Sequence, residues 1–258
     1  MMKKLFVLTL SIFLCTLNSN AAIMQGGVSE NSSIKYNRVI DKTTQTPIQG
    51  AKIRIPQTGY TTYSDNNGKF AMPSYTPPNS ILSVQKDKYK PFSLTINEKN
   101  MNKPLSIGIE KSNRFDITVD TEIYHIGDNN YSMASANAGE FRSSAVGPVY
   151  RKTFFLPAGG NSQKYLVIGS IIGIDTALAR GMGQNSIITS YASPPKVYFN
   201  GQKIAEIKIN GDNQRINIPP YLIRPNQNNE IKIAAGINLQ QTAYVDFDDI
   251  EFMNLNIE

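Results

Sequence analysis

The sequence has little of several residue types whose presence would point to particular classes of protein. Its 258 residues include no tryptophan, one cysteine and one histidine, His125. One cysteine cannot form an internal disulfide, and one histidine excludes zinc sites built from several histidines. A Ser-His-Asp triad would have to be built around His125, and no Gly-x-Ser-x-Gly motif accompanies it. No catalytic constellation is visible, and we predict a protein that is not an enzyme.

The charge balance is mildly basic. The chain has 26 Lys and Arg residues against 20 Asp and Glu residues, a formal net charge of +6 at pH 7. Nucleic-acid-binding proteins usually concentrate their basic residues on one stripe or one helix. Here these residues are scattered singly among Asn, Gln and Thr, so we expect a solvated surface and no nucleic-acid partner.

The first residues have the pattern of an export signal. Lys3 and Lys4 precede the apolar run Leu5–Cys15, and small residues follow where cleavage would occur. We therefore predict a signal peptide over residues 1–21 and a mature protein that is secreted, periplasmic or on the cell surface. The apolar run is shorter than the roughly 20 residues that a membrane-spanning helix needs, and no longer run follows it. No membrane span is expected.

The position of the cysteine raises the alternative of a lipid anchor. Cleavage just before Cys15 would expose it for acylation. A lipoprotein signal has a small residue before the cysteine, whereas the bulky Leu14 stands there. Cleavage near Ala21 is the preferred reading, and it leaves a mature protein without a thiol, whose stability must come from core packing.

From Ile34 onward the chain repeats short alternating apolar runs bounded by Gly, Pro, Asn and Asp, a pattern typical of strands and turns. An all-β protein is the prediction. The expected strands are Lys52–Ile55, Ile81–Val84, Phe92–Ile96, Leu105–Ile109, Phe115–Val119, Lys164–Ile168, Lys196–Phe199, Ile204–Ile209, Glu230–Ile233 and Tyr244–Phe247.

A polar stretch, Glu110–Arg114, divides these strands into two blocks. We accordingly place one domain at residues 33–110 and a second at residues 112–258. The one window with helical character, Ile174–Arg180, is expected to form only a short helical turn, because glycines follow it closely.

The first block carries a series of motifs in a fixed order. Val39–Ile55 contains a strand ending in Asp, a Thr-rich turn, Pro-Ile-Gln-Gly-Ala and a second strand. Thr58–Thr62, Asp65–Phe70 and the Lys-Tyr pair of Lys88–Phe92 follow at the expected spacing. Together these motifs resemble the carboxypeptidase regulatory-like domain. The resemblance implies a seven-stranded β-sandwich of transthyretin-like topology, a non-catalytic module generally attached to other domains.

Two turns can be predicted in detail. An EF-hand-like calcium loop would place glycine at position six, whereas Gly68 is at position four counted from Asp65, so we predict a turn in which Asp65 bonds to local backbone. Asn200 and Gly201 lie between two expected strands, and this pair favours a type I′ hairpin with positive φ at both residues.

The second block resembles the galactose-binding-like jelly-roll domains. His125–Tyr131 and Tyr150–Lys152 match their opening motifs, and Lys196–Ala205 and Ile216–Pro219 match their later hairpin and its continuation. The resemblance implies a jelly-roll β-sandwich that is either a carbohydrate-binding or a structural unit. The fold alone does not choose between these roles.

Carbohydrate recognition would need aromatic platforms together with amide or carboxylate groups in a concave or loop-built site. The polar loop Arg180–Asn185 is the most favourable place for specificity, and Tyr198 offers a further ring. A lone histidine in a turn, with Asp128 three residues on, is commonly a structural residue, although the pair could also hold a cation. The candidate ligand-binding residues are His125, Asp128, Tyr131, Asn137, Asn185 and Tyr191.

The densest acidic tract is Asp246–Phe252. The jelly-roll resemblance implies a possible structural calcium with an acidic ligand from the last strand, and Asp248 and Asp249 would be the residues to supply it. A glycan hydrolase with two carboxylates is an alternative, but neighbours on one strand point to opposite faces.

We therefore expect an exported, non-catalytic binding protein that recognises carbohydrate through its second domain. The first alternative is a structural or adhesive envelope protein that binds a protein partner, and the second is a glycan hydrolase that uses acidic residues.

Overall fold

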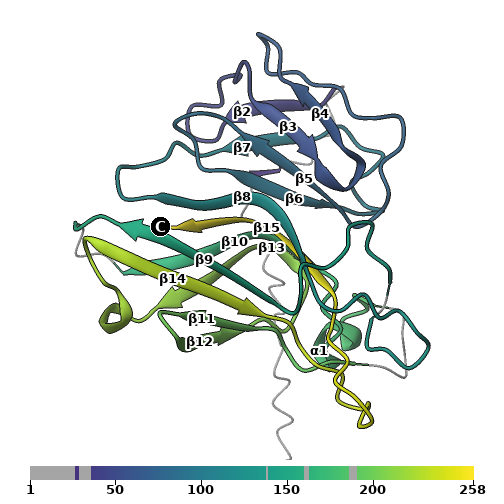
Figure 1. Cartoon of the computed structure of the whole chain (residues 1–258). Helices are drawn as coiled ribbons and strands as arrows, with labels where there is room; N and C mark the ends of the chain where they lie inside the picture. Colours follow the sequence, from purple (N-terminus) through teal and green to yellow (C-terminus); the bar gives the residue numbers. More distant parts are fainter. Residues whose placement is uncertain (1–26, 29–35, 138, 160–162, 186–190) are drawn as a thin grey trace, which may run out of the picture.

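The computed structural model describes residues 27–28, 36–137, 139–159, 163–185 and 191–258. The protein is all-β, as predicted, with 45% of residues in strands and 5% in helices. Its strands form four sheets that stack as layers (Figure 1). The expected signal peptide lies outside the described residues. None of the helices in the described ranges is long and apolar enough to cross a membrane.

The first sandwich is made of strands β1 to β7. One sheet has the order β1-β7-β2, with β2 and β7 parallel, and the other has the order β4-β3-β5-β6. Alternation in the sequence sets the inward faces: Ile53 and Ile55 are fully buried, whereas Lys52 and Arg54 are not. The strands are β1 (Gly27–Val28), β2 (Arg38–Asp41), β3 (Lys52–Ile55), β4 (Tyr60–Tyr63), β5 (Ser80–Gln85), β6 (Phe92–Ile96) and β7 (Ser106–Ile109), with a 3₁₀ turn at Pro56–Thr58.

The second sandwich is made of strands β8 to β15. Its inner sheet, β13-β10-β15-β8, faces the first sandwich, and its outer sheet, β12-β11-β14-β9, lies on the far side (Figure 1). Phe199 and Phe252 are fully buried between the two sheets. The elements are β8 (Ile117–Ile126), β9 (Val149–Leu156), β10 (Lys164–Ile172), α1 (Ala177–Gly181), β11 (Lys196–Phe199), β12 (Gln202–Glu206), β13 (Gly211–Ile218), a 3₁₀ turn at Pro220–Leu222, β14 (Gln227–Ala234) and β15 (Ile250–Ile257).

Three of the expected strands are wrong in extent or in kind. The run predicted at 115–119 begins only at Ile117 and continues to Ile126. The run predicted at 204–209 ends at Glu206, because the next residue, Ile207, turns into the core and bonds through its N–H to Pro195 O. The run predicted at 244–247 is a loop. Tyr244 and Val245 are exposed, and Phe247 N donates to a side chain rather than to a neighbouring strand.

Both predicted turns are confirmed, as is the short helix. Asp65 Oδ1 accepts from the backbone N–H groups of Asn67 and Lys69, each at 2.8 Å. Asn200 and Gly201 have φ values of 47° and 85°, both positive as a type I′ turn requires. The helix α1 spans Ala177–Gly181.

The two sandwiches pack sheet against sheet, with β6 of the first against β10, β13 and β15 of the second. We call this interface the joint. Its centre is unusually polar: Ser93 Oγ lies 3.0 Å from Ser170 Oγ, and Thr95 N donates to both carboxylate oxygens of Asp212 at 3.0 and 3.1 Å. A small apolar cluster at one side, Ile81, Ile172 and Met253, completes the joint.

Candidate functional site

Four of the predicted ligand-binding residues and one predicted calcium ligand come together in a buried network, which we call the histidine lock. His125 lies at the end of β8, and its Nε2 is 2.6 Å from Asp249 Oδ1 just before β15. Its Nδ1 is 2.6 Å from the carbonyl oxygen of Ser143. Both side chains are almost fully enclosed, with 1% and 0% of their surface exposed.

The other bonds to Asp249 all come from donors. Asn137 Nδ2 donates at 2.9 Å, the N–H of Asn129 at 3.1 Å and the Tyr131 hydroxyl at 3.4 Å. Asn137 Oδ1 also accepts from Asp249 N at 2.5 Å, so that the two side chains clasp each other. Both oxygens of this carboxylate therefore face hydrogen-bond donors.

The charge of His125 follows from its two partners. A carbonyl oxygen and an anionic carboxylate are both acceptors, and only the doubly protonated imidazolium can donate to both. Burial alone would lower the pKa of His125, but the hydrogen bonds to Asp249 and Ser143 outweigh it and raise that pKa. An imidazolium has no lone pair, so His125 in this state can neither ligate a metal nor act as a base.

Asp128 and Asp246 extend the lock into the neighbouring loops. Asp128 Oδ2 accepts from Phe247 N at 2.9 Å, and Asp246 Oδ2 accepts from Ala136 N at 3.0 Å and from Asn238 Nδ2 at 2.9 Å. Burial raises the pKa of Tyr131 to about 12, which keeps its hydroxyl a donor. The lock therefore ties the 127–148 loop to the 236–249 loop, and its groups are occupied with one another.

Asp248, the other predicted calcium ligand, does not join the histidine lock, and its carboxylate accepts few hydrogen bonds. It is fully buried, its Oδ2 accepts from Asp175 N at 3.2 Å, and its Oδ1 has no hydrogen-bond partner among the described residues. Burial and the neighbouring Asp175 carboxylate raise its pKa well above the usual value. Asn185, predicted as a ligand residue, donates to Asp175 Oδ1 at 2.8 Å, while its own Oδ1 is buried with no partner in the part of the chain that the structure describes.

The remaining predicted residue, Tyr191, lies apart from the lock. Its ring is half-buried beneath the Arg180 guanidinium, 4.4 Å from the ring centroid. Within the described part of the chain, no three His, Cys, Asp or Glu side chains are grouped so as to hold a metal ion.

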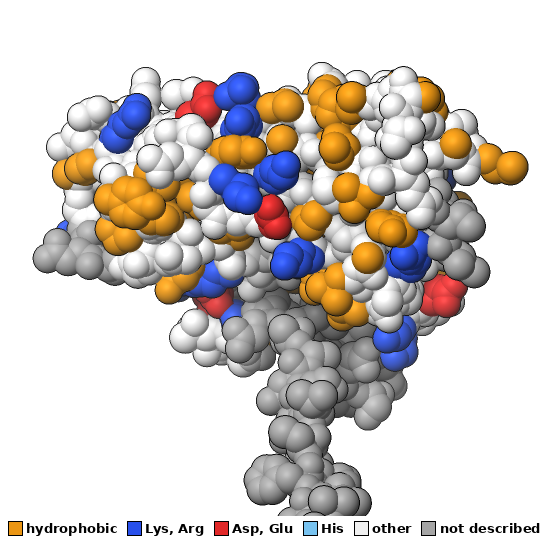
Figure 2. Space-filling view, turned by 90° about the horizontal axis from the view of Figure 1, so that it is seen from below, with side chains coloured by type: hydrophobic (Ala, Val, Ile, Leu, Met, Phe, Trp, Pro, Cys, Tyr) orange, Lys and Arg blue, Asp and Glu red, His pale blue; other side chains and the backbone are white. Residues whose placement is uncertain are grey.

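The outer sheet of the second sandwich presents an uncovered face, which we call the open face (Figure 2). Cross-strand partners share a face, so the pairing of Tyr198 with Lys232 and Lys203, and of Lys232 with Arg151, sets these four side chains side by side. The Lys232 ammonium lies 3.6 Å from the Tyr198 ring centroid. Figure 2 shows Lys and Arg side chains gathered near the centre of this view with apolar side chains around them.

The charge on the open face is asymmetric. Arg151, Lys196, Lys203 and Lys232 face outward from its strands, against Glu206 and Glu230. The two acids are paired, Glu230 with Arg151 at 3.1 Å and Glu206 with Lys203 at 2.9 Å. Lys196 lies across the strand pair from Glu206 but forms no ion pair within 4 Å, and Lys232 forms none either among the described residues. At one end of the face the Phe155 ring is 55% exposed.

The sequence analysis missed most of these open-face residues and all of the joint. Tyr198 was the one aromatic side chain of the open face that the sequence singled out. Period-2 alternation could have identified its cationic neighbours, because each stands at an outward position of a predicted strand. Asp175 could have been noticed as a lone acid that follows a nine-residue, largely buried strand.

A scan against protein-family models finds no match for this chain, and a search of curated proteins finds none similar to it.

Proposed function

We propose that the protein is an exported, non-catalytic binding module that recognises acidic polysaccharide through the open face. The observation that carries the proposal is the pairing of a half-buried aromatic ring, Tyr198, with an excess of cations on a sheet face that no other described element covers. Aromatic rings contact the C–H face of sugars, and Lys and Arg donate to carboxylates. The transthyretin-like and jelly-roll assignments of the two sandwiches belong to the same proposal.

The absence of enzymatic activity is also part of the proposal. In support, the sole histidine donates both of its N–H groups inside the histidine lock. The three carboxylates Asp246, Asp248 and Asp249 are each almost fully buried, out of reach of a glycosidic bond.

The test is a binding experiment on the mature full-length chain with acidic and neutral polysaccharides, such as polygalacturonate and dextran, by affinity electrophoresis. We expect retardation by the acidic polymer, and a loss of about tenfold in affinity, or 1.4 kcal/mol, for Tyr198→Ala. Tyr75→Ala is the matched control, since Tyr75 is 66% exposed on the first sandwich. Equal binding of dextran, or an unchanged Tyr198→Ala variant, would refute the proposal.

A second candidate function, docking of a protein partner, is favoured by one observation. Exposed apolar side chains lie on α1 and directly after it, and on the 127–148 and 236–249 loops, which are linked by the bond from Asn238 Nδ2 to Ala134 O. Exposed apolar patches commonly mark protein interfaces. If this candidate holds, Leu239→Asp with Val245→Asp removes retention on envelope fragments and leaves polysaccharide binding intact. The exposed apolar side chains of this second candidate surface are Met133, Val146, Leu178, Met182, Ile237, Leu239, Tyr244 and Val245.

We also propose that any structural calcium binds at Asp248 rather than at Asp249. The oxygens of Asp249 are occupied by donors, whereas Asp248 Oδ1 and Asn185 Oδ1 find no partner among the described residues and Asp175 adds a second carboxylate nearby. Carboxylate and amide oxygens are the ligands that calcium prefers.

A further inference from the structure

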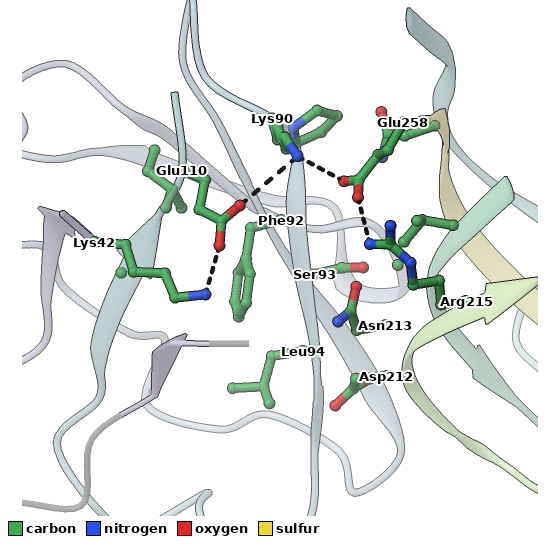
Figure 3. Close-up of a pocket in the computed structure, with 16 residues that line it drawn as sticks. Lys42, Lys90, Phe92, Ser93, Leu94, Glu110, Asp212, Asn213, Arg215 and Glu258 are labelled. Atoms are coloured by element: carbon green, nitrogen blue, oxygen red, sulfur yellow. Dashed lines mark hydrogen bonds and ion pairs between the residues drawn. The ribbon is translucent and has the colours of Figure 1, made fainter. Parts of the chain in front are cut away.

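The joint between the sandwiches contains a pocket of about 180 Å³ that both halves of the chain line (Figure 3). Lys42, Lys90, Phe92 and Glu110 come from the first sandwich. Asp212, Asn213, Arg215, Asn256 and Glu258 come from the second. The volume is below the roughly 300 Å³ at which drug-sized pockets begin. The pocket therefore suits a ligand of about one sugar ring or smaller.

Five of the charged groups around the pocket are already paired in an alternating chain, and the sixth, Asp212, accepts hydrogen bonds from Thr95 and Ser170. Glu110 accepts from Lys42 at 2.5 Å, and Glu258 is 3.1 Å from Lys90 and 3.0 Å from Arg215. Lys90 also lies 3.7 Å from Glu110, and this contact joins the Lys42–Glu110 pair to the Lys90–Glu258–Arg215 group (Figure 3). A ligand with a net charge would have to separate one of these pairs. The arrangement therefore favours a ligand without net charge.

Two amide side chains at the pocket make no hydrogen bonds to the described residues. Asn256 on β15 is only 5% exposed, and Asn213 on β13 is held with φ of 54°. Neither side chain takes part in an ion pair or a ring contact with the described residues. Asn213 is exposed, whereas Asn256 is enclosed by its neighbours. Each of these amides offers both a donor and an acceptor to a ligand.

The rest of the lining is apolar. Phe92, Leu94, Ile109 and Val167 contribute apolar side chains from both sandwiches, and Gly108 and Gly169 also line the pocket. In Figure 3 the Phe92 ring stands between the Lys42–Glu110 pair and the Glu258–Arg215 pair. A molecule that fits must present apolar C–H groups on one side and neutral hydrogen-bonding groups at its edge.

We infer that the joint pocket binds one neutral sugar residue. A pyranose ring has an apolar C–H face for Phe92 and a rim of hydroxyls that both donate and accept, as the Asn213 and Asn256 amides require. Hydroxyls also bond to paired carboxylates and ammonium groups without separating the pairs. The site is distinct from the open face and does not depend on the function proposed for it.

Saturation-transfer NMR on the mature full-length chain tests this inference. The probes are glucose, galactose, mannose and N-acetylglucosamine, with glucuronate as a charged sugar and glycine betaine as a zwitterion without hydroxyls. We expect saturation transfer from the protein to at least one neutral sugar, with a dissociation constant in the millimolar range, and no transfer to glycine betaine. Methyl glycosides of the sugar that binds then tell a free sugar from a chain end, because a chain end keeps its affinity when the anomeric hydroxyl is blocked.

The variant Asn213→Gly removes one amide and keeps the backbone conformation, since glycine adopts positive φ readily. We expect it to weaken sugar binding at least tenfold. Asn79→Gly is the matched control, because Asn79 has a φ of 61°, is exposed and lies outside the pocket. Asn256→Ala provides a second, independent removal.

Several results would overturn the inference. These are the absence of saturation transfer to every neutral sugar, tighter binding of glucuronate than of glucose, or unchanged affinity in both Asn213→Gly and Asn256→Ala. A signal that Tyr198→Ala abolishes and Asn213→Gly leaves intact would assign the sugar to the open face instead. If the protein binds monosaccharides but no polysaccharide, only the open-face proposal is refuted.

Discussion

Asp248 and Asp249 are adjacent in the chain, both are buried, and their surroundings are opposite. Asp249 lies in the histidine lock, where an imidazolium and several neutral donors meet its carboxylate. Asp248 faces the Asp175 carboxylate, with one oxygen unpartnered in the described structure. Because neighbours on an extended segment point to opposite sides, one step along the chain separates a satisfied charge from an unsatisfied one. Burial of a carboxylate therefore does not by itself tell whether that group stabilises or destabilises the fold. Its hydrogen-bond and charge partners decide this.

The largest effect should come from removing the charge of Asp249. In Asp249→Asn the His125 imidazolium stays buried without its anion, and we expect a loss of about 3–5 kcal/mol in the free energy of unfolding. Urea denaturation followed by tyrosine fluorescence or circular dichroism measures it. The same substitution one residue earlier, Asp248→Asn, is the matched control. A loss below about 1 kcal/mol would mean that His125 is neutral in the folded protein.

A smaller effect should appear as pH rises. The folded-state pKa of His125 lies above the ordinary value of 6.5, so the stability that the lock contributes is full below pH 6.5. It is lost as the pH rises through the folded-state pKa, at about 1.4 kcal/mol per unit of pKa difference. Thermal midpoints between pH 5 and 9 record the decline, and His125→Gln should remove it. The single imidazole also gives one NMR titration, and a midpoint below 6.5 would contradict the ion pair.

The smallest effect, and the one of opposite sign, is expected for Asp248→Asn. Folding raises the pKa of the Asp248 carboxyl, so the protein loses stability as the pH rises from 3.8 through the folded-state pKa. In a chelator at pH 7 we therefore expect the variant to be more stable than the unsubstituted protein by about 1 kcal/mol. Millimolar calcium should stabilise the unsubstituted protein and leave the variant unchanged. Equal stabilisation of both by calcium would place the cation elsewhere.

Much of the fold follows from the sequence, because strand period and turn residues act locally. The alternation of Lys52–Ile55 and the Asn200-Gly201 pair each specify a backbone state without help from distant residues. The run 244–247 has the same alternation and is nevertheless a loop. Alternation indicates a strand only where one face is buried, and Tyr244 and Val245 have no layer to cover them.

The site was predicted less well than the fold, for a physical reason. The turn motif brought His125, Tyr131 and Asn137 to attention, but a sequence shows residue types and not which donor meets which acceptor. Polar positions such as Ser93 and Thr95 alternate with apolar ones like any solvent-facing row. Nothing local reveals that a second sandwich covers them, and the joint with its pocket was missed for that reason.

The register of the inner sheet has a consequence for how this architecture could be rearranged. Ile117, at the start of β8, pairs directly with Ile257, at the end of β15, so the second sandwich begins and finishes at one place. It could be grafted into a surface loop of another protein through a single attachment point. It could equally be circularly permuted, by linking β15 to β8 and opening the chain at the Asn200-Gly201 turn, without a change of register.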